Sequence, residues 1–578
     1  MNFTYKSGLI PIVVGITGHR DIPPSQVTTI LDSIDKCLDK FDINYPNSPK
    51  ILISGLAEGI DQIAAVLALK KGWGLYAALA LPRNEFIQTF DQPNTENSVK
   101  TFNELISKAT YVEEINVSNT PSPECYINVS HFIASKSQWL IACWDGKDSK
   151  IKDGGTSYTV KVFKDGIPSI TPEVPDNGPI TWINTHRNFS LNSNPPGETI
   201  DLAPTTSQVS IDAIQSVNDK KYLNIWEKII KKIDQFNEKA SLLLDEDFEK
   251  IDKKRKNYLQ IKDALSASSE KASWLFAVSD ELSMQSAKKR SMGVLGLVLG
   301  SVLALTCHAI YSDSPITHWS WQMASLLVAL FTALTVVDLP VWLKNILPSF
   351  LVFNVKQIED NYLDYRALAE SCRVQYFWSV AGLKESASHY YLREQRDETE
   401  WIRQAVLNTQ LFKIDEGYTL DSRMVEYILN AWILDQKKFF VNSKKSMHYH
   451  EYQEKRLGLI SKYFFLIGIS LTLISLIMQL FGIKDDQTQW IDFSYSIALI
   501  ISAGVKLYQE PQGHPELSRS YQKMGLMMLL AQEKLSLYID DTESLKHIIM
   551  KLGIACLNEN AEWLQMHRSR PVSFVFGG

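Results

Sequence analysis

The chain has 578 residues, of which 45% are hydrophobic and 21% are charged, and its formal net charge at pH 7 is -6. This length predicts two or three structural units, and the charge balance lacks the basic field typical of proteins that bind nucleic acid. The six cysteines form no CxxC pair, and the N-terminus lacks the pattern of a signal peptide. We therefore expect a reduced, cytoplasmic setting for the soluble parts.

The N-terminal third alternates short β-prone runs with stretches that can form helices. The runs are IPIVVGI, KILISG, LYAALALP, WLIACWDG and ITWIN. Strand followed by helix, repeated, predicts a parallel sheet with helices on both faces. Ligands of such sheets bind at the carboxyl ends of the strands, near the point where the strand order reverses. We therefore predict an α/β, Rossmann-like domain over residues 1–187.

Three loops after these strands carry residues suited to a phosphate-bearing ligand. In GITGHRD, the glycines let the backbone approach a ligand, and the histidine and arginine can meet phosphate or carboxylate. SGLAEGID ends a strand and opens a helix, and the loop after WDG closes on GGT at an expected helix start, where backbone N–H groups favour phosphate. With the arginine of LPRNEF, the candidate ligand-binding residues are Gly15, Thr17, Gly18, His19, Arg20, Ser54, Gly55, Glu58, Gly59, Asp61, Arg83, Trp144, Asp145, Gly154, Gly155 and Thr156.

Between this domain and the C-terminus, composition predicts three further regions. A stretch rich in Asn, Ser, Thr and Pro predicts a linker over 188–217. Helical sequence predicts a collar with a first membrane hairpin over 218–415, and a second helical and membrane unit over 416–570. Within 218–415, Asn354–Trp378 repeats apolar residues every three or four positions, which predicts a helix with one apolar stripe.

Four apolar segments interrupt the helical regions. Three of them carry no formal charge over 18 or more residues and are long enough to cross a bilayer. The fourth, Phe493–Val505, is shorter, but Trp490 and Tyr508 flank it as interfacial aromatic residues do. We predict four spans, over about 291–312, 320–343, 461–483 and 490–508.

Charges flanking these segments predict the orientation. Lys288, Lys289 and Arg290 precede the first span and Lys455 and Arg456 precede the third, whereas the two hairpin loops contain one lysine between them. By the positive-inside rule, both termini and the long middle segment are cytoplasmic.

Other polar residues receive plainer interpretations. His448 and His450 lie two residues apart on an expected helix and point to different faces, so we predict no metal site. We interpret His308 as an interfacial residue, while Asp338 fits equally a gate element or a cytoplasmic cap.

The two halves of the chain resemble two families. ITGHRD, LISGLAEGIDQIAA, LPRNEFIQTFD and ACWDGK with GGT resemble the SLOG superfamily, whose relatives include the DNA-processing protein A fold and the Lonely guy phosphoribohydrolases. SDELSMQSAKKR, YLDYRALAESCRVQYFW, WIRQAVLN and HYHEYQEKRLGLISKYFF are similar to the SLATT group of two-span effector domains in bacterial antiphage systems. Together the two resemblances cover nearly the whole chain.

The resemblance implies a receptor joined to a membrane effector. The SLOG-like head would bind a nucleotide-derived signal, related to NAD or ADP-ribose or a cyclic nucleotide, with no other cofactor required. The SLATT-like part would permeabilise or depolarise the membrane. The implied protein is a multi-pass homo-oligomer of the bacterial inner membrane with no nucleic-acid partner.

One departure bears on catalysis. Lonely guy enzymes share a PGGxGTxxE motif whose glutamate takes part in cleavage, but here GGT is followed by SYTV. Glu58 is the nearest alternative acid. The plainer interpretation of Glu58 is a solvated residue whose charge is favoured by the helix dipole. We expect binding without turnover. The alternatives are a membrane-anchored nucleotide-processing hydrolase and a membrane scaffold with a degenerate pocket.

Overall fold

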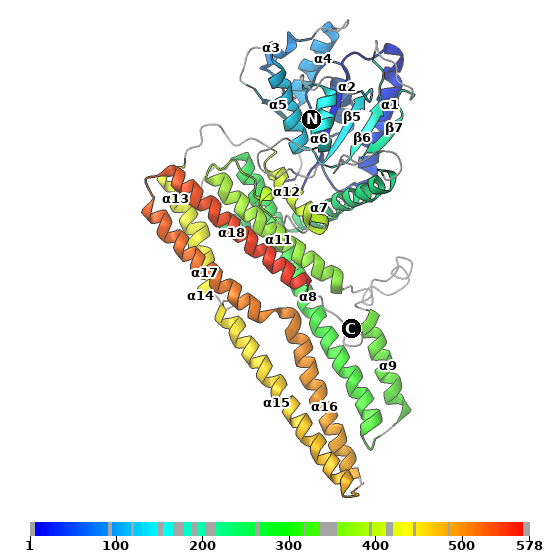
Figure 1. The fold of residues 1–578 in the computed structure, drawn as a ribbon, viewed down its shortest axis with the longest axis vertical. Coiled ribbons are helices and arrows are strands. Elements are labelled where there is room, and N and C mark those ends of the chain that lie inside the picture. Colours follow the sequence, from blue (N-terminus) through cyan, green and yellow to red (C-terminus); the bar gives the residue numbers. More distant parts are fainter. Residues whose placement is uncertain are drawn as a thin grey trace. The chain divides into compact units, whose positions relative to one another are not determined.

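A computed structural model describes residues 6–90, 95–116, 121–147, 154–165, 178–187, 195–202, 215–259, 266–316, 318–334, 355–391, 396–411, 420–442, 447–483 and 486–569. The chain divides into two compact units, each built from several stretches of sequence (Figure 1). The first unit consists of Met1–Lys253, Ala264–Val278 and Lys384–Glu416, and the second of Lys254–Asp263, Ser279–Leu383 and Gly417–Gly578.

A seven-stranded sheet in the order β4-β3-β2-β1-β5-β6-β7 forms the centre of the first unit. The strands are β1 (Ile12–Gly18), β2 (Lys50–Ser54), β3 (Gly74–Leu79), β4 (Tyr111–Glu114), β5 (Trp139–Trp144), β6 (Ile180–Asn184) and β7 (Thr199–Leu202). All neighbours pair in parallel except β6 and β7. The strand order reverses at β1, which lies between β2 and β5, so the predicted Rossmann-like α/β sheet is confirmed.

The sequence pattern identifies five of these strands and misses the two at the edges. Both β4 and β7 have four residues, and neither is buried along its length. β7 reads TIDL and lies inside the range whose composition predicts a linker. Short edge strands lack the continuous apolar run that marks a strand covered on both faces.

Helices cover both faces of the sheet and pack closely on β1. They are α1 (Val27–Asn44), α2 (Ile60–Lys70), α3 (Arg83–Ile87), α4 (Thr95–Lys108), α5 (Pro123–Lys136) and α6 (Thr156–Asp165). A Cβ atom on Gly15 would lie 2.9 Å from Ile133 Cγ2 of α5, and one on Gly18 would lie 2.4 Å from Ile60 Cβ of α2. Because Gly15 and Gly18 face opposite sides of β1, α5 and α2 cover opposite faces.

Two further helices of the first unit contact the segment that enters β1. Asn237 of α7 (Gln215–Leu259) accepts a hydrogen bond from Ile10 N and donates one to Ile10 O, both at 2.8 Å. Asn408 of α12 (Arg396–Thr409) donates to Pro11 O at 2.8 Å. α7 and α12 therefore contact the amino end of β1, opposite the end that carries the predicted ligand site.

The second unit is helical throughout its described part. Its elements are α8 (Ala267–Asp313, whose first residues belong to the first unit), α9 (Trp319–Leu334), α11 (Val355–Val380), α13 (Ser422–Ile428), η4 (Leu429–Leu434), α14 (Asp435–Asn442), α15 (Met447–Leu480), α16 (Asp486–Gln509), α17 (His514–Leu537) and α18 (Thr542–Arg568). The prediction of one apolar stripe on α11 is wrong. Asp364, Arg373 and Gln375 are buried like their apolar neighbours, because other helices surround α11. On one side Gly553 of α18 fits against the Trp378 ring, where a Cβ would lie 2.2 Å from Nε1.

In the part of the chain that the structure describes, three helices are long and apolar enough to cross a membrane. They are α8, α15 and the helical stretch Thr488–Leu537, which contains the short fourth segment. The second predicted span includes residues 335–343, which lie outside the described residues. Asp338 is one of them. Many apolar side chains of these helices are exposed; Leu299 of α8 is 58% exposed and Leu473 of α15 is 54% exposed.

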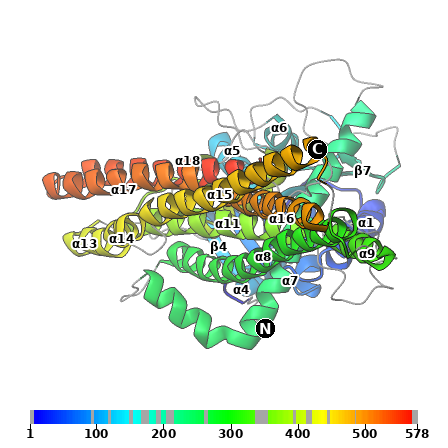
Figure 2. The same cartoon turned by 90° about the horizontal axis from the view of Figure 1, so that it is seen from below.

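Helix α16 packs against both α15 and α8 (Figures 1 and 2). Ser461 Oγ of α15 donates to Ser502 O at 3.1 Å, and Ser502 Oγ donates back to Ser461 O at 2.9 Å. A Cβ on Gly504 would lie 2.6 Å from Val302 Cγ2 of α8. Near the last residue of α8, Ser496 Oγ donates to Asp313 Oδ2 at 2.6 Å.

A buried ion pair joins three segments of the second unit at the basic end of the first apolar run. Arg290 of α8 donates to Glu359 Oε1 of α11 from Nε at 3.0 Å and from Nη2 at 2.8 Å. Nη2 also donates to the carbonyl oxygen of Pro511, between α16 and α17, at 3.2 Å. The side chains of Arg290 and Glu359 are 9% and 5% exposed.

Candidate ligand-binding site at the strand ends

Two of the predicted loops meet where the strand order reverses. β1 and β5 pair with Gly18 beside Cys143, so the residues that follow each strand emerge side by side. His19 Nε2 lies 3.3 Å from Asp145 Oδ1, with side-chain exposures of 11% and 6%. This contact lies at the edge of the sheet where ligands of Rossmann-like folds bind.

The surroundings of His19 favour its neutral form. The backbone N–H of Asp145 lies 3.2 Å from His19 Nε2, so backbone and side chain of Asp145 both contact this nitrogen. Burial lowers the pKa of His19, the charge of Asp145 opposes this effect, and the charge of Arg187 adds to it. His19 Nε2 therefore lies within hydrogen-bond reach of both the N–H and the carboxylate of Asp145, which fixes the ring at the end of β1.

The start of α2 closes the site from the β2 side. Gly59 has φ +85°, and a Cβ there would lie 2.8 Å from the carbonyl oxygen of Arg20. The N–H of Ile60 donates to His19 O at 3.5 Å. Leu56, with φ 52°, is a non-glycine residue in the left-handed region, and its N–H donates to Ser54 Oγ at 3.1 Å. The two loops thus support each other through backbone contacts that exclude a Cβ at residue 59.

Two acids of SGLAEGID are buried. Glu58 is 1% exposed, so its interpretation as a solvated residue is wrong. Burial raises the pKa of Asp61 to about 7, although the Arg20 charge and backbone hydrogen bonds from Ala57 and Gly18 lower it. Asp61 Oδ1 has no hydrogen-bond partner among the described residues. The site therefore contains a carboxyl group that can gain or lose its proton near neutral pH.

We expect the Asp61→Asn variant to be more stable than the wild type at pH 8 and similar to it near pH 4. Because folding raises the pKa of Asp61 to about 7, the folded state holds this proton more tightly than the unfolded state. The stability of the wild type therefore falls between about pH 4 and pH 7, by roughly 4 kcal/mol at most from this residue. Urea unfolding of both proteins at pH 4.5 and pH 8 measures the difference.

The exposed residue Asp32 supplies the control, because Asp32→Asn should leave the pH dependence unchanged. A loss of stability at pH 8 in Asp61→Asn would show that the ionised carboxylate is favourable in the fold.

Arg20 connects the first loop to the third. Its guanidinium lies 5.9 Å from the centroid of the Tyr126 ring, and Nη1 donates to Thr89 O at 3.4 Å. Tyr126 in turn packs on Gly154, because a Cβ on Gly154 would lie 2.5 Å from the carbonyl carbon of Tyr126. A Cβ on Gly155 would meet no described atom within 4 Å. Among the described residues, none therefore crowds the Cβ position of Gly155, directly before the start of α6 at Thr156.

The structure separates the candidate residues into two groups. One group gathers around the ends of β1, β2 and β5 and the start of α6: Gly18, His19, Arg20, Ser54, Gly55, Glu58, Gly59, Asp61, Asp145, Gly154, Gly155 and Thr156.

The remaining candidates have other contacts. Gly15 and Thr17 are buried within β1, and Gly15 faces α5 instead of a ligand. Trp144 Nε1 donates to Lys147 O at 3.1 Å, and its ring lies 6.0 Å from that of Trp182. Arg83 Nη2 donates to Asn103 Oδ1 at 2.7 Å.

Two residues at the site, Tyr126 and Arg187, escape the sequence pattern. Tyr126 comes from α5, the helix that leads into β5, where no loop motif marks it. Arg187 Nε donates to Asp21 Oδ2 at 3.0 Å, and both charges act on the pKa of His19. The position of Arg187 three residues after β6 is the one signal that could have found it, because it follows a predicted strand.

Comparison with known proteins does not extend this description. No protein-family model matches the sequence, and no curated protein matches it significantly. Among the described residues, no group of three or more His, Cys, Asp or Glu is placed to hold a metal ion. The charged and titratable side chains that the structure brings together at the strand ends include His19, Arg20, Asp61 and Asp145.

Proposed function

We propose that the protein is a membrane-bound receptor-effector of bacterial antiphage defence. Its first unit binds a nucleotide-derived signal at the carboxyl ends of β1, β2 and β5, and its second unit permeabilises or depolarises the inner membrane. The observation that carries the proposal is the presence in one chain of a strand-end site and of three long helices with exposed apolar side chains. A soluble enzyme has no use for such helices.

The groups at the strand ends suit the parts of a nucleotide. Arg20 and the N–H groups at the start of α6 favour a phosphate. The His19 imidazole offers a polar ring, and Asp145 and Asp61 can accept hydrogen bonds from ribose hydroxyls. The proposed ligands are NAD, ADP-ribose or related molecules, and cyclic nucleotides.

The helical unit supports a membrane role that involves several copies of the chain. α16 packs directly on α8 and α15, with glycine and serine at the contacts, so these helices leave little room for a path within one copy. The exposed leucine, isoleucine and phenylalanine side chains match a lipid environment or a neighbouring copy. We propose a homo-oligomer in which conduction occurs between subunits, with both termini cytoplasmic.

We expect the Arg20→Ala and Gly155→Trp variants to bind the ligand at least tenfold more weakly than the wild type. The first removes a charge-assisted hydrogen bond, and the second fills the open space at the start of α6. Binding of ADP-ribose, NAD and cyclic AMP to the full chain in detergent is measured by calorimetry. Arg423→Ala, which removes an exposed arginine of the second unit, is the matched control. Unchanged affinity in both site variants would overturn the assignment of the site.

The second candidate is a membrane-anchored hydrolase that processes a nucleotide. One observation favours it: a carboxyl group whose pKa is about 7, such as that of Asp61, can act as a general acid or base at neutral pH. Product formation by the wild type, with loss in Asp61→Asn and in Glu58→Gln, would support the hydrolase. Binding without any product supports the receptor.

A further inference from the structure

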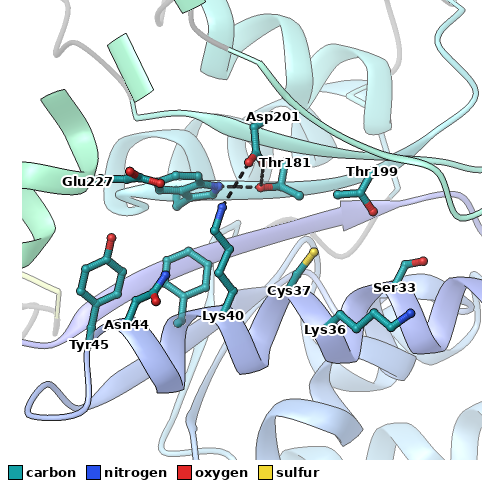
Figure 3. Close-up of a pocket in the computed structure, with 12 residues that line it drawn as sticks. Ser33, Lys36, Cys37, Lys40, Asn44, Tyr45, Thr181, Thr199, Asp201 and Glu227 are labelled. Carbon is teal, nitrogen blue, oxygen red and sulfur yellow. Dashed lines mark hydrogen bonds and ion pairs between the residues drawn. The ribbon is translucent and has the colours of Figure 1, made fainter. Parts of the chain in front are cut away.

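The first unit contains a cavity of about 280 Å³ away from the strand-end site (Figure 3). It lies between α1, the β5–β6–β7 side of the sheet and α7. Its lining residues are Ser33, Lys36, Cys37, Lys40, Phe41, Asn44, Tyr45, Trp139, Thr181, Thr199, Asp201 and Glu227. The residues from α1 repeat at intervals of three and four, so a single face of that helix forms one wall.

The middle of the cavity has an apolar floor with its polar groups already paired. Trp139 and Phe41 are 3% and 5% exposed, and their rings pack edge to face with centroids 5.5 Å apart. Trp139 Nε1 donates to Thr181 Oγ1 at 2.8 Å, and Thr181 Oγ1 donates to Asp201 Oδ1 at 2.6 Å. Lys40 Nζ lies 3.3 Å from Asp201 Oδ2. An occupant of this middle part therefore meets aromatic surface and no uncompensated charge.

The two ends of the cavity carry opposite charges. Glu227 and the Tyr45 ring lie at one end in Figure 3, and Lys36 lies at the other, on the same side as Ser33 and Thr199. Neither Glu227 nor Lys36 forms an ion pair with another described residue. One end therefore favours a cation and the other an anion.

We propose that this cavity binds a small zwitterion with a flat apolar body, its ammonium group toward Glu227 and its anionic group toward Lys36. The site is separate from the strand-end site and is independent of the proposed nucleotide ligand. Because Glu227 belongs to α7, the occupant contacts both the sheet and the helix that contacts the amino end of β1.

The probe is 4-(aminomethyl)benzoate, which carries its two charges at opposite ends of an aromatic ring. Cys37 lines the cavity and reports occupancy through its alkylation by N-ethylmaleimide in the full chain in detergent. Burial raises the pKa of the Cys37 thiol to about 12, so labelling is followed over hours at pH 9 by mass spectrometry of its peptide. We expect saturable protection of Cys37 and unchanged labelling of Cys556, which belongs to the second unit.

Charge variants test the orientation. We expect Glu227→Gln and Lys36→Gln each to weaken protection by the probe at least tenfold, and benzylamine and benzoate to protect the wild type at least tenfold more weakly than the probe. Asp32→Asn and Lys228→Gln change exposed residues on α1 and α7 outside the cavity. In these two variants the probe should protect Cys37 as well as it does in the wild type.

A second readout covers the case in which Cys37 reacts too slowly. The probe should raise the unfolding temperature of the wild type, and this shift should disappear in Glu227→Gln and in Lys36→Gln. Absence of both protection and thermal shift would overturn the proposal, as would equal protection by the probe, benzylamine and benzoate.

Discussion

Bacteria that express the full-length protein are expected to lose membrane potential and stop growing after phage infection, whereas cells with Leu299→Arg or Leu473→Arg are expected to keep their potential. Leu299 and Leu473 lie near the middle of the apolar runs of α8 and α15 and are 58% and 54% exposed. An arginine at the centre of a span costs about 2.5 to 3.5 kcal/mol. A voltage-sensitive dye and culture density, followed after infection, measure the two effects.

Two further variants separate the membrane effect from general damage. Leu242→Arg changes a leucine of α7 in the first unit that is 59% exposed, and it should behave like the wild type. Arg20→Ala should keep the potential, because a signal shifts an equilibrium only through its different affinity for the two states. If growth stops while the potential holds and nucleotide pools fall, the hydrolase is the correct function.

The Arg290→Ala variant is expected to lower the free energy of unfolding by about 3 kcal/mol. The substitution removes a buried positive charge beside the buried carboxylate of Glu359, and it removes a donor to the Pro511 carbonyl. Urea unfolding of the full chain in detergent, followed by circular dichroism, measures the change.

Lys289→Ala is the matched control, since Lys289 is exposed and precedes Arg290 directly. Its effect should stay within about 0.5 kcal/mol of the wild type. Equal stability of the two variants would show that the ion pair contributes nothing net to the fold.

The central strands could be predicted because each is a continuous apolar run, as expected for parallel strands covered on both faces. The edge strands could not, since TIDL of β7 differs little from the polar sequence around it. The shorter apolar segment Phe493–Val505 lies within the longer helix α16, where Asp492 accepts a hydrogen bond from Ser475 of α15. Such a pairing between helices leaves no local signal in sequence.

The candidate site was predictable in outline but not in the role of its glycines. Parallel strands bring their following loops to one edge, so His19 and Asp145 meet although they lie far apart in the chain. Gly15 and Gly18, however, lack a Cβ because α5 and α2 pack against them. Close approach of a ligand and close packing of a helix both require a residue without a Cβ, and sequence alone does not distinguish the two causes. The contact of Arg20 with Tyr126 depends on tertiary packing in the same way.

The position of the site within the first unit constrains how a ligand can act. His19 and Asp145 lie at the carboxyl ends of β1 and β5, whereas α7 and α12 contact Ile10 and Pro11 at the amino end of β1. The α1 helix runs along this sheet and lines the cavity next to Glu227. If the proposed ligand acts on α7 or α12, its effect would have to cross the length of β1.

The Arg290 ion pair marks one of two points at which α8 is bonded to neighbouring helical segments of the second unit. It joins α8, α11 and the segment between α16 and α17 at one point, and from there to Asp313 α8 rises roughly 35 Å. The far end is held to α16 through the hydrogen bond from Ser496 to Asp313 at 2.6 Å. This stretch of α8 is thus tied at both ends, by Arg290 to Glu359 of α11 and by Asp313 to Ser496 of α16, so it cannot shift relative to either helix without breaking one of these contacts.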